Sequence, residues 1–410
     1  MVILHIGPHK TATTTIQCDL SYYQHQLHDE SNVTFLGRMG SRSCRNKRYG
    51  NADFTYNFEM RSILGNCDDK MMSSCLKKRE PVLLERHLRE LSSQNKTILI
   101  SDEAFSRMSP KSQYGNHRTI FSLLEKYYPG RVKVVIVYRR YYDWIVSKYN
   151  QENKPYFNGR GTYLPQSIEW PSGGPSAGGS QARNAITFSA YYRNLQRSVS
   201  MDPESLVDDY VVLAHSKDLH PVEYLRDIYL KYTDQIQILN LHDMQSDATD
   251  VTTHFLREVF PSMTIPKDDD RNTDQQYNPS RNFDFDILAV AAKRKGFTGK
   301  LSRPRVAKYA EKHLQEYLEG KDRELANPLP LRCLDDAQFE DFLKRTLEYE
   351  RRLFPDKQST DLEKSFREAD LKKKFCNIDA ERLLSSKAVE QFFRAKARAE
   401  ADRSKGSYDY

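Results

Sequence analysis

The sequence predicts an α/β fold built on a mostly parallel sheet with helices on both faces. Short apolar runs at Val2–Ile6, Thr97–Ser101 and Val132–Tyr138 have the length and composition of buried strands. Each run is followed by a segment with helical spacing, and strands that alternate with helices favour a doubly wound parallel sheet. Strand signals disappear from about residue 280 onward, so we expect a helical C-terminal extension there.

The remaining elements follow from local patterns. Two weaker strands are expected at 33–36 and 235–241. Helical spacing and helix-stop residues predict helices at 13–27, 81–91, 119–128, 141–150, 185–199, 221–232 and 249–260. These elements divide the chain into an α/β domain at 1–265 and a helical extension at 280–410.

Two segments interrupt the predicted α/β domain. Residues 38–75 are rich in Arg, Asn, Ser and Gly and are interpreted as an irregular insertion. Residues 154–183 are rich in Gly and Pro and are interpreted as a long loop, which in compact domains is usually a functional lid or disordered.

The composition limits the function classes. Of 410 residues, 63 are Lys or Arg and 56 are Asp or Glu, which gives a net charge of +7. Nucleic-acid binders usually concentrate more charge in a smaller domain, so we expect an anionic small ligand and no nucleic acid. No apolar run approaches the ~20 residues of a membrane span, and no signal peptide is visible. As given, the chain is expected to be soluble.

The cysteines and the glycosylation motifs leave the compartment open. Six cysteines are too few and too scattered for a disulfide scaffold. A bridge between Cys67 and Cys75 and a set of free thiols are equally good interpretations. Asn32 and Asn95 each begin an N-x-T motif, which matters only in a secretory lumen.

The segment between the first strand and the first helix has the properties of an anion-binding loop. It reads Gly7-Pro8-His9-Lys10-Thr11-Ala12-Thr13-Thr14-Thr15. A helix N-terminus offers backbone N–H groups and a positive dipole end, to which the threonine hydroxyls and the Lys10 ammonium would add. The alternative is a threonine-capped helix with a surface lysine. The segment is not a Walker A loop, because the second glycine is missing and Lys10 precedes the threonines.

A second candidate anion site follows the strand Val132–Tyr138. Arg139 comes directly after this strand, at the edge where folds of this kind bind ligands. Ser147 lies eight residues later on the following helix, so the two side chains are candidates for gripping a second phosphate. The alternative is an Arg139 that pairs with Asp143.

These two segments, in this order, resemble the family of sulfotransferases that use PAPS (3′-phosphoadenosine-5′-phosphosulfate), particularly the carbohydrate-type domains. The family's 5′-phosphosulfate loop reads P-K-[ST]-G-T-T, and its 3′-phosphate element is an Arg at a strand end with a Ser eight residues on. The resemblance covers about residues 1–265 and implies a sheet like that of P-loop NTPases. This chain departs from the pattern at the inserted His9, at Ala12 in place of the loop glycine, and at Tyr141 in place of a frequent proline.

The resemblance implies a set of residue roles. Lys10 would neutralise the leaving oxygens, and Arg139 and Ser147 would hold the 3′-phosphate. The 5′-phosphate would be held by the loop residues His9, Lys10, Thr11, Ala12, Thr13, Thr14 and Thr15. Glu103, just after the strand Thr97–Ser101, is the first candidate for the general base, and His9 is the second. The alternative for Glu103 is a cap of the next segment. The cofactor is PAPS without a metal, and the acceptor is a hydroxyl or amine, with a glycan preferred.

One further string also occurs in cytosolic members of the family. Residues 294–299 read R-K-G-F-T-G, but the aromatic residue and the lysine that should follow are missing. We therefore interpret this segment as a helix that ends in basic residues with a glycine cap.

Two rival functions and two compartments remain open from the sequence. A P-loop-type small-molecule kinase would need the Walker A lysine that is absent here, and a non-catalytic PAP- or phosphate-binding module is compatible with Ala12. Carbohydrate sulfotransferases usually carry an anchor before the phosphate loop. We therefore expect either a cytoplasmic enzyme or a Golgi-lumen enzyme whose anchor is missing from this chain.

Overall fold

The computed structural model describes residues 1–7, 12–36, 82–101, 105, 120–152, 187–199, 221–242, 250–261, 263, 284–326, 328–356, 363–364, 367 and 375–405. The chain forms two compact units, one from Met1–Trp144 and Asp208–Pro279, the other from Ile145–Val207 and Ser280–Tyr410. Residues 145–207, part of the predicted first domain, thus group with the C-terminal helices. The predicted boundaries of 1–265 and 280–410 stay a prediction. The predicted insertion 38–75 and loop 154–183 lie outside the described residues.

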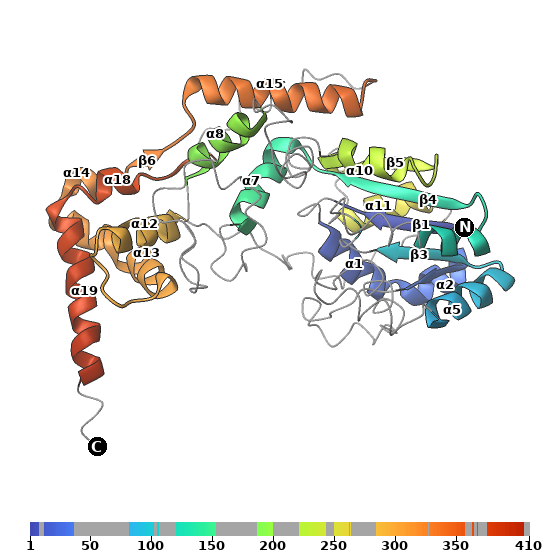
Figure 1. Ribbon diagram of the computed structural model, residues 1–410, viewed down its shortest axis with the longest axis horizontal. Helices are drawn as coiled ribbons and strands as arrows, with labels where there is room; N and C mark the ends of the chain where they lie inside the picture. Colours follow the sequence, from blue (N-terminus) through green and yellow to red (C-terminus); the bar gives the residue numbers. More distant parts are fainter. Residues whose placement is uncertain are drawn as a thin grey trace. The chain divides into compact units, whose positions relative to one another are not determined.

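A five-stranded, all-parallel sheet forms the centre of the first unit (Figure 1). Its strand order is β2-β3-β1-β4-β5. The strands are β1 (Val2–Ile6), β2 (Val33–Phe35), β3 (Thr97–Ser101), β4 (Val132–Tyr138) and β5 (Ile236–Asn240). The three strongest apolar runs of the sequence are the three middle strands, which are buried along almost their whole length as a central parallel strand should be. The expected mixed α/β architecture is confirmed.

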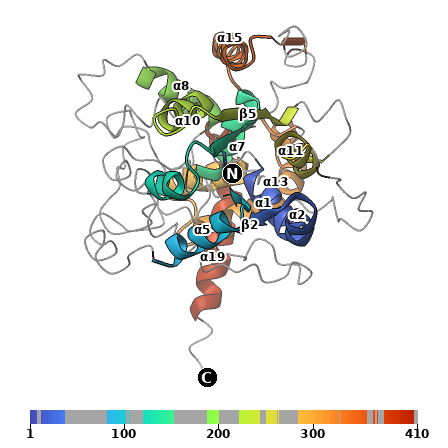
Figure 2. The same ribbon diagram turned by 90° about the vertical axis from the view of Figure 1, so that its right-hand side faces the viewer.

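Helices cover both faces of this sheet, as Figure 2 shows with the strands nearly end-on. On one side lie α1 (Thr13–Tyr22), α2 (Gln24–Ser31) and α11 (Val251–Val259), and on the other lie α5 (Val82–Ser93) and α10 (Pro221–Tyr229). The core on this side is formed by alternate side chains of the strands and by the inner faces of α1 and α11. It includes Ile3, Leu99, Val135, Val137 and Leu239 of the strands, Ile16 and Leu20 of α1, and Phe255 and Leu256 of α11.

The first helix differs from its expected course. The pattern at 13–27 predicts one helix, but the chain forms α1 and α2 with a break at Tyr23, whose φ of −84° and ψ of 3° are not helical. Tyr23 is 2 % exposed and packs into the core under α1. A helical periodicity continues across the break, so the sequence pattern did not reveal it.

The second unit is mainly helical. It contains α8 (Phe188–Val199), α12 (Asp284–Arg294), α13 (Arg303–Glu319), α14 (Arg323–Ala326), α15 (Asp336–Leu353), α18 (Ala380–Leu383) and α19 (Lys387–Lys405). It also contains a short antiparallel pair, β6 (Leu331–Arg332) with β7 (Asn377–Ile378), which the sequence did not predict. Helix α7 (Tyr141–Glu152) begins in the first unit and ends in the second.

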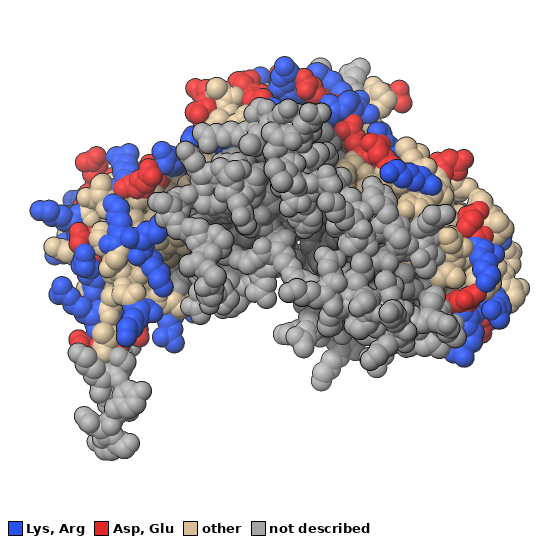
Figure 3. All heavy atoms as spheres, in the orientation of Figure 1, with Lys and Arg blue, Asp and Glu red and all other residues tan. Residues whose placement is uncertain are grey.

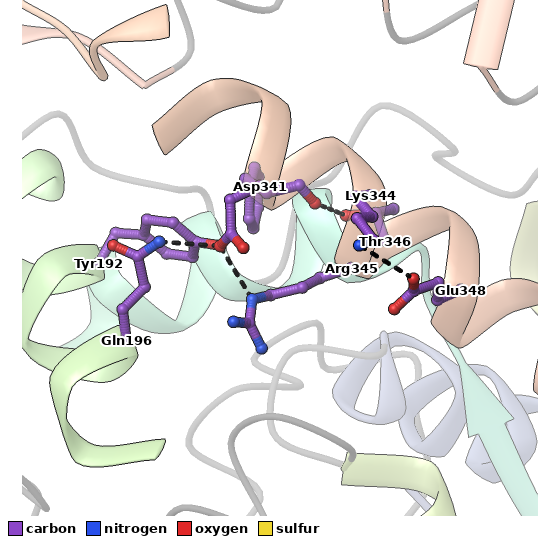
Figure 4. Close-up of polar contacts among 8 residues, drawn as sticks. Tyr192, Gln196, Asp341, Lys344, Arg345, Thr346 and Glu348 are labelled. Atoms are coloured by element: carbon purple, nitrogen blue, oxygen red, sulfur yellow. Dashed lines mark hydrogen bonds and ion pairs between the residues drawn. The ribbon is translucent and has the colours of Figure 1, made fainter. Parts of the chain in front are cut away.

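Helices α8 and α15 are joined by an aromatic cluster and by one carboxylate. Phe188 and Tyr192 of α8 pack on Phe342 of α15. Beside them, the Asp341 Oδ2 atom accepts hydrogen bonds from Tyr192 at 2.6 Å, Gln196 at 2.8 Å and Arg345 at 2.9 Å (Figure 4). Burial disfavours the charged form of Asp341, but these hydrogen bonds outweigh it and lower the pKa of the carboxyl.

A disulfide between Cys333 and Cys376 closes the β6–β7 pair. Cys18 on α1 is also disulfide-bonded. The interpretation of these cysteines as free thiols is therefore wrong, whereas Cys67 and Cys75 lie outside the described residues. Asn377, next to the bridge, is a buried hub: its amide oxygen accepts from the Phe188 N–H at 2.6 Å, and its amide nitrogen donates to Asp284 at 2.8 Å.

Helix α12 ends as its sequence predicts. Gly296 has a φ of +72°, the Gly296 N–H donates to the Lys293 carbonyl, and the Phe297 N–H donates to the Ala292 carbonyl. This pair of hydrogen bonds is a Schellman cap, so the interpretation of residues 294–299 as a glycine-capped helix end is confirmed. Among the described residues, no helix is long and apolar enough to cross a membrane.

Candidate functional site

The strand order creates a switch point beside β1. From this central strand the chain first builds β2 and β3 on one side and later β4 and β5 on the other. In open parallel sheets, ligands bind at such a point, outside the carboxyl ends of the strands. Gly7 follows β1 here, and Arg139 follows the neighbouring strand β4. The candidate loop and the candidate arginine therefore leave the sheet at the same edge. His9, Lys10, Thr11 and Glu103 lie outside the described residues.

Helix α1 begins at Thr13 after an unusual N-cap. Ala12 has a φ of 58° and a ψ of 12°, in the left-handed region, and gives no side-chain cap. No acidic residue occupies the first turn. Holding a Cβ in this region costs roughly 1–2 kcal/mol. The sulfotransferase pattern has glycine at this position, and the local backbone explains why glycine would suit it.

The threonines of the loop differ in accessibility. Thr13 is 1 % exposed, so its side chain belongs to the interior of the first unit. Thr15 is half-buried on the first turn of α1. The Thr14 backbone is helical, and its side chain lies outside the described set. Among the loop threonines whose side chains the structure describes, Thr15 is partly exposed to solvent and Thr13 is not.

Arg139 is half-buried at the end of β4. Burial lowers the pKa of its guanidinium, while the nearby Asp143 and Tyr142 oppose that shift. The alternative noted from sequence, a pairing of Arg139 with Asp143, stays a prediction. Ser147 is 6 % exposed on α7 and belongs to the second unit, whereas Arg139 belongs to the first. Their cooperation in one site stays a prediction.

A buried polar network ties three elements together beneath this edge. The His5 Nδ1 atom on β1 lies 2.7 Å from the Ser101 Oγ atom on β3. The Gln17 side chain on α1 donates to the Ser101 carbonyl at 3.1 Å. Ser101 is the last residue of β3 and precedes Glu103 by two residues. Its hydroxyl and its carbonyl are therefore both hydrogen-bonded at the end of this strand.

His5 is neutral in this environment. It is fully buried and packs against the Phe255 ring with a centroid distance of 4.6 Å. Burial lowers the pKa of His5 to about 3. Among the residues that the structure describes, its Nε2 atom has no hydrogen-bond partner. His5 was not among the candidates selected from the sequence, although a single polar residue within an apolar strand was the available signal.

A second buried pair joins α1 to α11. The Thr252 hydroxyl donates to the Asp19 carboxylate at 2.6 Å. Asp250 caps α11 by accepting from the N–H groups of Thr252 and Thr253. Together with the His5 network, this pair fixes the helix that follows the candidate loop to both the sheet and a neighbouring helix.

In the part of the chain that the structure describes, no three His, Cys, Asp or Glu side chains converge in a way that could hold a metal ion.

Comparison with known proteins gives no relative. No protein-family model matches the chain, and it matches no curated protein and no solved structure.

Proposed function

We propose that this protein is a PAPS-dependent sulfotransferase with a P-loop-like, doubly wound α/β domain. The observation that carries the proposal is the parallel pairing of β1 with β4. It supports a common edge for the loop after β1 and for Arg139. Two anion-binding elements at one edge suit a ligand with two separate phosphate groups, which distinguishes PAPS from ATP.

In the proposed reaction the acceptor oxygen attacks sulfur. The bond between sulfur and the 5′-phosphate oxygen breaks, and the acceptor proton passes to Glu103. Lys10 would neutralise the leaving phosphate, and the loop residues up to Thr15 would hold it. Arg139, with Ser147, would hold the 3′-phosphate, for which the planar guanidinium is well suited. The His5 and Gln17 network would keep the strand end before Glu103 in place.

The disulfides support one compartment over the other. Stable disulfides form in oxidising compartments and are rare in the cytosol. Cys333–Cys376 and the bonded Cys18 therefore favour the lumen of the secretory pathway. A hydroxyl of a glycan is the acceptor that fits such a compartment.

The ligand preference is tested by calorimetry on the full chain with PAP, the 3′-phosphorylated product, and with ADP. We expect tighter binding of PAP. Arg139→Ala should remove this preference, whereas Arg131→Ala, an exposed arginine just before the same strand, should retain it. Unchanged PAP affinity in Arg139→Ala would refute the 3′-phosphate assignment.

Turnover is tested with labelled PAPS and a panel of glycan acceptors. Lys10→Ala should abolish sulfate transfer. Glu103→Gln should slow it while PAP binding persists, because the general base acts on the acceptor. PAP binding without transfer to any acceptor would favour a non-catalytic PAP-binding module, and preferential ATP binding would favour a kinase.

A further inference from the structure

The turn after α12 and the first half of α13 carry a local excess of positive charge. Residues 293–312 include eight Lys or Arg and one acidic residue, Glu311, although the whole chain is close to balanced. Figure 3 shows Lys and Arg side chains gathered over α12, α13 and α19. This surface belongs to the second unit and contains none of the residues assigned to the proposed transferase site.

Four of these cations form the basic stripe, defined as Lys300, Arg305, Lys308 and Lys312. All four are exposed. In the described part of the chain, none of their side chains makes an ion pair or a hydrogen bond. On the neighbouring helix α19, by contrast, Arg394 pairs with Glu390 and Lys396 with Glu400. The four cations of the stripe differ in this from Arg394 and Lys396.

Helical spacing aligns three of the four cations of the stripe. Arg305, Lys308 and Lys312 are three and four residues apart, so they lie on one face of α13. Like charges at these spacings destabilise a helix by a few tenths of a kcal/mol per pair. Glu311 and Glu316 are the acidic residues at helical spacing from Lys308 and Lys312, but no ion pair joins them to the stripe among the described residues.

The polarity of α13 adds to the positive potential. Its first turn contains no acidic residue, and its N-cap Ser302 makes no side-chain hydrogen bond. Acidic side chains normally favour this end of a helix because the dipole is positive there. Here basic residues occupy it, so the dipole and the side chains attract the same kind of ligand, an anion.

The helix that carries most of the stripe is anchored in a hydrophobic core. Helices α12, α13 and α19 share one buried core, which includes Leu288, Ala292, Val306, Ala310, Leu314, Val389, Phe392 and Phe393. The backbone that carries the cations is therefore already ordered, so that binding a ligand does not have to order it.

We propose that the basic stripe binds a polyanionic glycan, a chain that carries sulfate or carboxylate groups. The argument for a glycan comes from the disulfide Cys333–Cys376 in the same unit. An oxidising compartment contains acidic glycans, whereas nucleic acids lie elsewhere and anionic lipids are concentrated in the cytoplasmic leaflet. This inference does not depend on the proposed transferase activity, because binding to the stripe requires no turnover.

The test is calorimetric titration of the full-length protein with a heparin fragment at two salt concentrations. With four cations engaged, and a salt slope of about 0.7 per contact as for a flexible single strand, raising salt from about 50 to about 200 mM should weaken binding about 50-fold. The triple variant Arg305→Gln, Lys308→Gln, Lys312→Gln should bind more weakly and lose only about threefold.

A matched control removes three cations that already have acidic partners. Lys126→Gln, Arg332→Gln and Lys344→Gln change the net charge equally, but Glu85, Glu381 and Glu348 pair with these residues. The control should keep the wild-type salt dependence. An equal loss in the control would overturn the proposal, as would salt-independent heparin binding. Tighter binding to a DNA duplex or to phosphatidylserine vesicles than to heparin would assign the stripe to those partners instead.

Discussion

Burial of His5 makes the stability of the sheet unit depend on pH. An unfolded histidine has a pKa of about 6.5, whereas burial lowers the pKa of His5 to about 3. Between these values the unfolded chain binds a proton that the folded chain excludes. The contribution of His5 to stability is therefore complete above about pH 6.5 and is lost progressively as pH falls toward about 3.

The expected size of the effect follows from the unfolded pKa. At about pH 5 the unfolded state gains about 2 kcal/mol by protonation, provided that the folded pKa lies well below 5. This corresponds to a roughly 30-fold decrease in the protection of β1 and β4 amides against hydrogen exchange, corrected for the intrinsic rate at each pH. The variant His5→Asn keeps a polar partner for Ser101 but does not titrate, so it should not show this decrease.

The control is His25→Asn, which removes an exposed histidine from α2. It should lose protection between about pH 7 and about pH 5 as the wild type does. If His5→Asn lost protection to the same extent, the protonation of His5 would not be the cause. A ring-carbon NMR titration of the wild type that showed protonated His5 at about pH 5 would also refute the reasoning.

Three further predictions follow from the fold. Replacing Cys333 and Cys376 together by serine should lower the unfolding free energy of the second unit by about 4 kcal/mol in urea titrations, because the bridge spans 43 residues; an unchanged urea midpoint would contradict this. Ala12→Gly should leave the unfolding free energy unchanged or raise it by up to about 1 kcal/mol in the same titration. Glycine removes the steric cost of a Cβ in the left-handed region, and this gain is at least as large as the entropic cost of a more flexible unfolded chain. A clear decrease would mean that Ala12 is not strained. Asn32 and Asn95 are exposed, so secreted protein should carry N-glycans that a glycosidase removes, with one mass step lost in each of Asn32→Gln and Asn95→Gln; a protein of unmodified mass would contradict lumenal folding.

Apolar runs made the sheet predictable. The expected bounds of β1, β3 and β4 agree with the structure because continuous burial leaves a continuous apolar signal. The pair β6–β7 was not predictable, because two residues per strand leave no periodicity. The break at Tyr23 was missed because the apolar spacing continues through it.

Of the candidate site, the sequence predicts only those residues that directly follow a recognisable strand. The apolar runs place Gly7 and Arg139 directly after strands, but the pairing of β1 with β4, which brings them to one edge, is a finding of the structure. The partners of Asn377 and the bridge from Cys333 to Cys376 could not be read from spacing, because both join residues distant in the chain. The same holds for the grouping of α8 with the C-terminal helices.

The aromatic face of α8 has a consequence for synthesis of the protein. Phe188 packs on Phe342 and on Phe375, which the ribosome adds much later. At about 5–20 residues per second, the last of these partners emerges about 10–40 s after Phe188. During that interval Tyr149, which is already synthesised, can pack on Phe188, but the surface that Phe342 and Phe375 later cover stays exposed. Chaperone binding during translation should therefore concentrate on this segment, and ribosome profiling of chaperone-bound chains would detect it.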